Sequence, residues 1–137
     1  NWPPASIFMG DAGSLFLGYT FGSLFLFTVM SGSLSIWTWL VVFGYFFSDI
    51  VITQILRIII VKKWYVGHRS HAYQNIARIT GSHFKVTIGV TIYHLIWLLP
   101  LTFWTVLQPE FVLIAVTLAL IPGLVLAYLY GPLFSSS

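Results

Sequence analysis

Residues 111–130 read FVLIAVTLALIPGLVLAYLY, a run of twenty positions without a charged side chain. Crossing the hydrocarbon core of a bilayer takes roughly 20 helical residues, so this run predicts a transmembrane helix. Three further stretches are nearly as apolar and about long enough to cross; they cover residues 14–30, 36–61 and 86–107. None of them alternates as a strand does, and backbone groups in lipid must be satisfied internally. The predicted fold is therefore all-α, a polytopic bundle of four membrane helices.

The composition of the whole chain agrees with this assignment. Of its 137 residues, 58% are hydrophobic and 7% are charged, whereas about 25% of residues are charged in an average protein. This balance excludes a water-soluble globular domain. The absence of cysteine rules out disulfide bonds and thiolate chemistry within the chain. The chain opens on Asn1 without an initiator methionine or a signal-peptide pattern, and we expect it to be the C-terminal part of a larger protein.

The basic residues gather in one segment of the chain. All six lie between positions 57 and 85, namely Arg57, Lys62, Lys63, Arg69, Arg78 and Lys85. Basic residues mark the cytoplasmic loops of membrane proteins, so the loop 62–85 is predicted to face the cytoplasm and to attract anionic lipid. A basic cluster can also bind nucleic acid, but the flanking spans argue against that partner. Counting spans from this loop places Asp11 on the same face of the membrane.

The predicted cytoplasmic loop also contains a segment of helical character. Ser70 is a suitable N-cap and Gly81 a suitable stop. Between them, Ala72, Ile76 and Ile79 share one helical face. We therefore expect a short helix that lies on the membrane surface, with a first turn whose free N–H groups favour an anion.

The glycines near the start of the first span suggest two different roles. Gly18 and Gly22 are four residues apart, a spacing that lets neighbouring helices approach closely, and we expect them to pack. Gly10 and Gly13 instead bracket Asp11, where a flexible backbone would let a ligand come near.

The few acidic residues point to chemistry at the cytoplasmic face. The chain holds three of them, Asp11, Asp49 and Glu110, and an ionisable group beside a membrane helix is by default functional. One carboxylate together with phosphate oxygens is how Mg²⁺ is usually held. Arginine binds phosphate through a bidentate fork, and histidine can donate to an anion. Asp11 and the basic loop together therefore predict phosphoryl transfer, which depends on positioning and charge neutralisation.

Three segments resemble one known family. The run FMGDAGS at residues 8–14 resembles the signature of polyprenyl-phosphate sugar-1-phosphate transferases (glycosyltransferase family 4), relatives of the peptidoglycan translocase and the bacterial GlcNAc-1-phosphate transferase. The run HRSHAYQ at residues 68–74 resembles the histidine motif of their last large cytoplasmic loop. Asp49, followed by Thr53 and Arg57, resembles the acid, threonine and arginine pattern of the helix before that loop.

The resemblance implies an Mg²⁺-dependent enzyme, with Mn²⁺ as the alternative ion, at the cytoplasmic face of the bacterial inner membrane. It implies transfer of a sugar-1-phosphate from a UDP-sugar to a polyprenyl phosphate such as undecaprenyl phosphate, with release of UMP, to initiate a cell-envelope polysaccharide. Asp11 matches the family's catalytic, metal-associated aspartate. The residues implied in nucleotide-sugar and phosphate binding are His68, Arg69, His71, Tyr73 and Gln74, with Gly10, Gly13, Asp49 and Arg57 as further candidates.

Two departures from the family pattern bear on the expected sugar substrate and on whether the chain is active by itself. The peptidoglycan translocase has consecutive histidines where this chain has His68 and His71, which favours an N-acetylated sugar and the enzymes that start O-antigen lipopolysaccharide. The family also carries an adjacent aspartate pair and an Asn/Asp motif in earlier loops, and no adjacent acidic pair occurs in this sequence. We therefore expect the 137-residue chain to be inactive by itself.

Several alternatives stay open at this level. Asp11 could be a helix N-cap. Asp49 could be structural, although Arg57 lies eight residues on, roughly 12 Å along an ideal helix. His68 and His71 could be solvated loop residues. A rival function is a transporter or channel segment with Asp49 and His94 on an ion path. Homodimer formation is also left open.

Overall fold

The computed structural model describes residues 6–60 and 71–132, and in these ranges it contains helices and no strand. Four longer helices form most of it: α1 (Gly10–Met30), α3 (Gly44–Ile60), α5 (His83–Tyr93) and α7 (Val112–Tyr130). Shorter ones are α2 (Ile36–Val42), α4 (Ala72–Thr80) and α6 (Leu99–Leu107), with a π-helical segment η1 (His94–Leu98) and a 3₁₀ segment η2 (Pro109–Phe111). The all-α fold class is confirmed.

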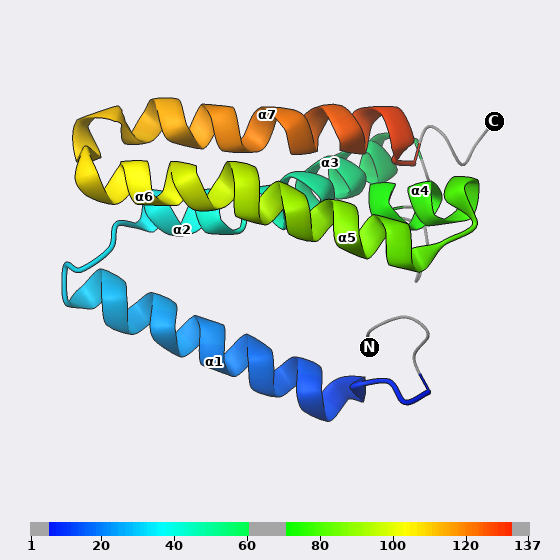
Figure 1. The fold of residues 1–137 in the computed structure, drawn as a ribbon, viewed down its shortest axis with the longest axis horizontal. Helices are drawn as coiled ribbons and strands as arrows, with labels where there is room; N and C mark the ends of the chain where they lie inside the picture. Colours follow the sequence, from blue (N-terminus) through cyan, green and yellow to red (C-terminus); the bar gives the residue numbers. More distant parts are fainter. Residues whose placement is uncertain (1–5, 61–70, 133–137) are drawn as a thin grey trace.

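Three helical stretches are long and apolar enough to cross a membrane: Gly10–Met30, His83–Leu107 and Pro109–Tyr130. A fourth crossing exists if the bent pair α2 and α3 forms one span. The bundle has two ends (Figure 1). One, here called the α4 end, holds α4, the start of α1, the start of α5 and the end of α7. The turns after α1 and after α6 lie at the other end, here called the turn end.

The stretch over residues 36–61, predicted as one span, is not a straight helix. It is broken between α2 and α3, which meet at an angle of 82°. Phe43 leaves the helical conformation at φ −95° and ψ 12°, and Gly44 follows as a weak helix former. A Cβ atom at Gly44 would lie 3.3 Å from the backbone oxygen of Ala119 in α7. The break therefore falls where the chain lies close to the backbone of α7.

The other boundaries shift at the helix ends. The first helix begins at Gly10 rather than at residue 14, so Asp11 lies in its first turn. The third begins at His83 rather than at residue 86, because the Ser82 hydroxyl accepts a hydrogen bond from the Lys85 backbone N–H at 3.3 Å. Pro100 has no N–H to donate, and the helix accommodates it with the π-helical turn η1 immediately before.

The core lies where α2, α3, η1 and α7 meet. Its buried apolar residues are Val41, Tyr45, Leu98, Ala115, Val116 and Ala119. The closest helix pair is α3 with α7, where a Cβ at Gly123 would lie 2.8 Å from the Cβ of Ser48. Gly18 and Gly22, expected to pack, have no atom within 4 Å of such a Cβ. That expectation is wrong within the described residues, and the close-packing glycines are Gly44 and Gly123.

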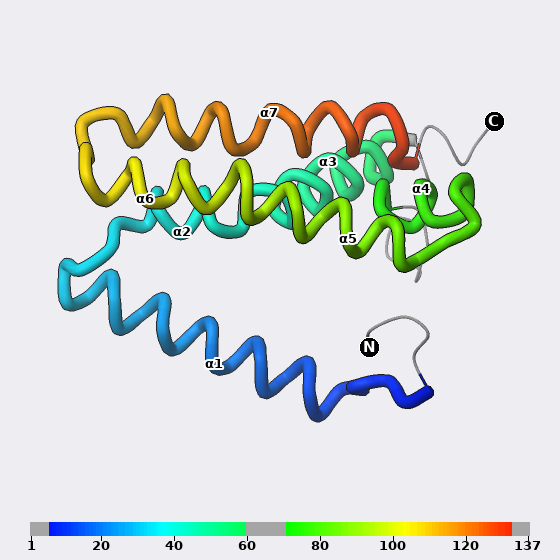
Figure 2. The backbone as a smooth tube through the Cα atoms, in the orientation of Figure 1, coloured from blue at the N-terminus to red at the C-terminus, as the bar shows by residue number. Residues whose placement is uncertain are grey.

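Helix α1 stands apart from the other helices. None of its residues is buried, and the tube in Figure 2 shows it diverging from the bundle toward the α4 end. It contacts α2 near the turn end, where Trp39 donates from Nε1 to the Thr28 hydroxyl at 2.8 Å, and the α2–α3 break, where Phe21 meets Phe43 edge to face. Phe25 also meets Trp39 edge to face, with ring centroids 5.9 Å apart.

Candidate functional site

The candidate site is built around the N-terminus of α4. Gly81 ends this helix as expected, with φ 61° in the left-handed region that glycine adopts freely. The N-cap is His71, so the expectation that Ser70 has this role is wrong. Of the residues expected on the apolar face, Ala72 is buried, Ile76 is half-buried and Ile79 is 54% exposed. The helix is amphipathic and buries Ala72, Asn75 and Ala77.

Asp49 of α3 lies directly beneath the start of α4. Its carboxylate is 3% exposed, and Oδ1 accepts hydrogen bonds from the backbone N–H of Ala72 at 3.0 Å and from the Thr53 hydroxyl at 3.3 Å. The second oxygen, Oδ2, lies 3.4 Å from Nδ1 of His71. The anion that the first turn of α4 favours is therefore supplied by the protein itself.

Asp49 belongs to a polar stripe on one face of α3. Thr53 and Arg57 follow it at intervals of four residues, and all three side chains are buried, with exposures of 3%, 1% and 7%. Residues four apart share a helix face, so the acid, threonine and arginine pattern of the sequence is one continuous surface in the fold.

The described part of the histidine motif forms a compact group. The imidazole of His71 is 24% exposed and stacks on the ring of Tyr73, with centroids 5.9 Å apart and planes 23° apart. Gln74 turns back so that its Oε1 accepts from the His71 backbone N–H at 3.3 Å, as in a capping box. The predictions for His68 and Arg69 fall outside the described residues.

Asp11 belongs to the first turn of α1, and the start of α1 lies at the same end of the bundle as α4 (Figure 1). Asp11 is exposed in this turn, where a carboxylate is favoured by the helix dipole. The N-cap position belongs to Met9, so the reading of Asp11 as the N-cap is wrong. Gly10 has φ 64°, a conformation that few other residues adopt, whereas Gly13 packs against the side chain of Met9.

The acidic and histidine residues set limits on metal binding. Among the described residues, no group of three His, Cys, Asp or Glu side chains is placed to hold a metal ion. Asp11 fits the part of a single carboxylate ligand, since Mg²⁺ keeps several waters and takes further oxygens from bound phosphates.

Asn75 is a site residue that sequence reasoning missed. It is 1% exposed, and its Nδ2 donates to the backbone oxygens of Tyr130 at 2.6 Å and Gly131 at 3.1 Å. These bonds join α4 to the end of α7. A polar residue flanked by buried alanines on an amphipathic helix was the available signal.

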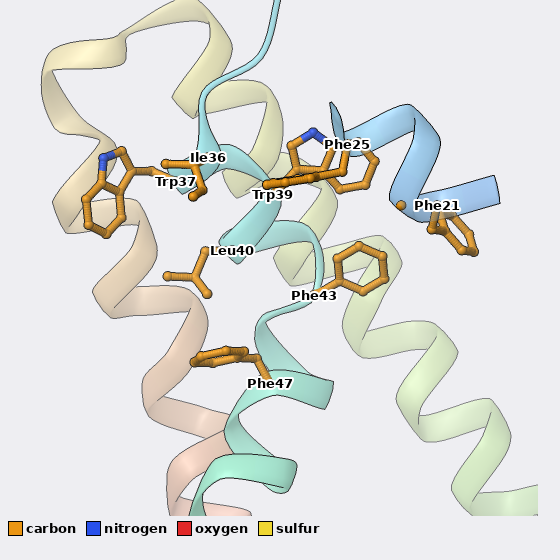
Figure 3. Close-up of a pocket in the computed structure, with 9 residues that line it drawn as sticks. Phe21, Phe25, Ile36, Trp37, Trp39, Leu40, Phe43 and Phe47 are labelled. Atoms are coloured by element: carbon orange, nitrogen blue, oxygen red, sulfur yellow. The ribbon is translucent and has the colours of Figure 1, made fainter. Parts of the chain in front are cut away.

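Two cavities lie against this framework. One of about 490 Å³ opens between α1 and the α2–α3 bend (Figure 3); it is lined by Phe21, Gly22, Phe25, Ile36, Trp37, Trp39, Leu40, Phe43 and Phe47. No lining residue is charged, so this cavity offers nothing to a phosphate. The other, of about 250 Å³, lies between α4 and α5 at the α4 end. Its walls are mostly apolar, and Lys85, Thr80 and Tyr45 are among its lining residues.

Comparison with known proteins gives one match. Residues 1–29 match the model of glycosyl transferase family 4. No curated protein sequence and no solved structure matches the chain. The matched segment contains the Gly10-Asp11 motif, so the family resemblance of that motif is confirmed. The match shows that the start of the chain is similar to glycosyl transferase family 4.

Proposed function

We propose that this chain is the C-terminal part of an integral-membrane transferase that moves a sugar-1-phosphate from a UDP-sugar to a polyprenyl phosphate. The observation that carries the proposal is the family match over residues 1–29, which includes Asp11 in the first turn of a helix that could span the membrane. An N-acetylated sugar, undecaprenyl phosphate as acceptor and the bacterial inner membrane, with the active face toward the cytoplasm, complete the proposal.

The reaction exchanges one P–O bond for another. An oxygen of the lipid phosphate bonds to the β-phosphorus that carries the sugar, and the bond from that phosphorus to the oxygen bridging to the α-phosphorus breaks. UMP leaves with the bridging oxygen and its electrons, and the product is a lipid-linked sugar diphosphate. A bound Mg²⁺ supplies charge neutralisation on the pyrophosphate. Asp11 would hold that ion through its carboxylate, and His71 with Tyr73 would contact the nucleotide sugar at the edge of α4.

The polyprenyl phosphate acceptor is supported by the cavity between α4 and α5. Its walls are mostly apolar, and Lys85 places a cation among its lining residues. A cation beside apolar walls suits a molecule with a phosphate at one end and a hydrocarbon chain at the other. We expect Lys85→Met to raise the KM for polyprenyl phosphate and to leave the KM for the UDP-sugar unchanged. An equal rise in both KM values would argue against this assignment.

The rival ion-path function needs Asp49 and His94 to share a polar passage. His94 instead bonds through Nδ1 to the backbone oxygen of Val90 in its own helix at 2.8 Å, and its ring packs against Phe46 with centroids 5.5 Å apart. Asp49 is engaged at the start of α4. The contacts of the two side chains among the described residues therefore favour the transferase.

The decisive variant is Asp11→Asn in the full-length protein, assayed in membranes with radiolabelled UDP-sugars, undecaprenyl phosphate and Mg²⁺. We expect lipid-linked product to disappear while the protein still accumulates, because the amide cannot replace a carboxylate on the metal. Glu110→Gln is the matched control: this acid lies in η2 at the turn end, and its loss should leave turnover unchanged. EDTA should abolish transfer, with Mg²⁺ or Mn²⁺ restoring it. Wild-type turnover by the Asp11→Asn protein would reject the proposal.

A further inference from the structure

We propose that the hydroxyl of Tyr45 donates a hydrogen bond to the phosphate of the polyprenyl acceptor, at the floor of the cavity between α4 and α5. The inference rests on the proposed function for the identity of the lipid. It goes beyond that function in assigning a phosphate-binding residue to α3, at a position that neither the acidic residues nor the histidine motif indicates.

Tyr45 is a buried tyrosine whose hydroxyl is not used within the described structure. The residue is 4% exposed and lines the cavity. Its ring packs edge to face against Tyr93 and His94, with centroids 6.0 and 6.1 Å apart, yet within residues 6–60 and 71–132 no group hydrogen-bonds its hydroxyl. Buried tyrosines usually find such a partner, and leaving the bond unmade is unfavourable. The hydroxyl is therefore available to a ligand that enters the cavity.

The two other hydroxyl groups that the described residues place in the cavity are engaged within the protein. Tyr93 donates to the backbone oxygen of Ala119 at 3.1 Å, and Thr80 donates to a backbone oxygen of its own helix at 2.9 Å. Lys85 supplies a positive charge to the same cavity. The hydroxyl of Tyr45 and this cation together match the oxygens of a phosphate, which accept hydrogen bonds and carry negative charge.

The shape of the cavity suits a lipid that enters from the side. Lys85, Gly89 and Tyr93 line it at intervals of four residues and so share one face of α5. Gly89 is exposed, and a Cβ there would meet no atom within 4 Å, so the wall is open at this point. The volume of about 250 Å³ corresponds to roughly eight water molecules. It would hold a phosphate and the first carbons of a chain whose remainder leaves past Gly89 into the hydrocarbon.

The floor of the cavity lies near the candidate site. Tyr45 interacts electrostatically with Asp49 and Tyr73, and Tyr73 is one of the residues proposed to contact the nucleotide sugar. The Asp49 carboxylate faces the start of α4, where it accepts the Ala72 N–H at 3.0 Å. A phosphate held by Tyr45 would thus lie beside the donor substrate, as transfer between two bound substrates requires.

Tyr45→Phe removes this hydroxyl and keeps the ring. In the full-length protein we expect the KM for undecaprenyl phosphate to rise about tenfold or more, the effect of one hydrogen bond to a charged group, with the KM for the UDP-sugar unchanged. Tyr128→Phe is the matched control, because this tyrosine is 59% exposed on α7, and neither KM should change. An unchanged KM for the acceptor in Tyr45→Phe, or an equal rise in both KM values, would overturn the inference.

Thermal unfolding without added lipid tests whether the hydroxyl is unused in the protein itself. Because Tyr45→Phe breaks no hydrogen bond among the described residues, its melting temperature should not fall below that of the wild type. Tyr93→Phe loses the bond to Ala119 and should melt a few degrees lower. A fall in Tyr45→Phe as large as that in Tyr93→Phe would show that the hydroxyl already has a protein partner and would contradict the proposal.

Lipid binding to the purified full-length protein keeps this inference separate from the proposed function. The probe is undecaprenyl phosphate, titrated in detergent and followed by native mass spectrometry, with phosphatidic acid as the competitor. We expect the dissociation constant of undecaprenyl phosphate to rise about tenfold in Tyr45→Phe, and equimolar phosphatidic acid to leave it bound. Displacement by phosphatidic acid would assign the cavity to a membrane phospholipid and reject the proposal. The expected change in a protein without transferase activity would retain the binding site and reject the function, whereas unchanged binding in an active enzyme would do the reverse.

Discussion

The substitution Gly123→Ala should loosen the helix pair that carries Asp49. Gly123 lies in α7 opposite Ser48, and a Cβ there would come within 2.6 Å of the Ser48 Oγ and 2.8 Å of its Cβ. Rotating the hydroxyl would relieve only the first contact, at the expense of the Ser48 hydrogen bonds to the backbone oxygens of Gly44 and Leu120. The second contact can be relieved only by moving a backbone.

Three contributions determine how much Gly123→Ala changes the free energy of unfolding. Overpacking in a close-packed interface destabilises by about 1–3 kcal/mol, and the weakened Ser48 hydrogen bonds add about 1 kcal/mol. Replacing glycine by alanine inside a helix returns roughly 0.8–1 kcal/mol of propensity. Gly18→Ala is the matched control, because Gly18 also lies within a helix but has no neighbour for a new Cβ. The propensity term is common to both, so the two variants should differ by about 2–4 kcal/mol.

Thermal unfolding of the detergent-solubilised protein, followed by tryptophan fluorescence, measures this difference. We expect the melting temperature of Gly123→Ala to fall roughly 5–10 °C below that of Gly18→Ala. Adding Ser48→Gly should recover part of the loss, because it removes the Cβ that the new methyl meets. Equal melting temperatures for the two alanine variants would refute the close approach of α3 to α7. Recovery by Ser48→Ala as large as by Ser48→Gly would locate the clash in the hydroxyl alone.

Two further substitutions test the contacts that hold α4 and α1. Asn75→Ala removes two hydrogen bonds to α7, each contributing about 1 kcal/mol. Hydrogen exchange of the α4 backbone amides should therefore accelerate by a factor of roughly 30. The control Ile79→Ala, at an exposed position of the same helix, should leave exchange unchanged. Trp39→Phe keeps an aromatic ring but removes the bond to Thr28, so protease cleavage in the turn between α1 and α2 should rise about fivefold, the effect of roughly 1 kcal/mol. Undiminished protection in either variant would contradict the corresponding contact.

The apolar spans could be predicted because lipid imposes a length on them. A helix must supply about 20 apolar residues whatever its neighbours are, and residues 111–130 show this without reference to the rest of the chain. Helix ends depend instead on single side chains near water. The Ser82 cap moves the start of α5 to His83, a shift that apolar length does not indicate.

The break before Gly44 and the packing of Gly123 could not be predicted in the same way. Gly18 and Gly22 have the spacing that allows close helix packing, yet a side chain at either would meet nothing within 4 Å. Whether a glycine packs depends on which helix lies opposite, and that is decided by contacts distant in the sequence. Ser48 and Gly123 are 75 positions apart.

Asp49 shows the same limit within the candidate site. From helical periodicity alone, the partner expected for Asp49 is Arg57, which lies two turns further along α3. The contacts in the structure come from Thr53, one turn along the helix, and from His71 and Ala72, more than twenty residues away. Asp11, by contrast, was recognisable from its motif, because its neighbours in sequence carry the family signature.

The buried polar residues of this bundle divide by charge between its two ends. Near the turn end, Thr105 donates to Thr38 and to a carbonyl of its own helix, and hydroxyl groups satisfied in this way cost little in a membrane protein. At the α4 end the buried groups include Asp49 and Arg57. Ionisable groups are rare in membrane bundles unless they pair or serve a site, and a pair of threonines would anchor α4 with less desolvation. The buried carboxylate of Asp49 serves both the helix and the histidine, since it accepts the Ala72 N–H at the start of α4 and lies 3.4 Å from Nδ1 of His71.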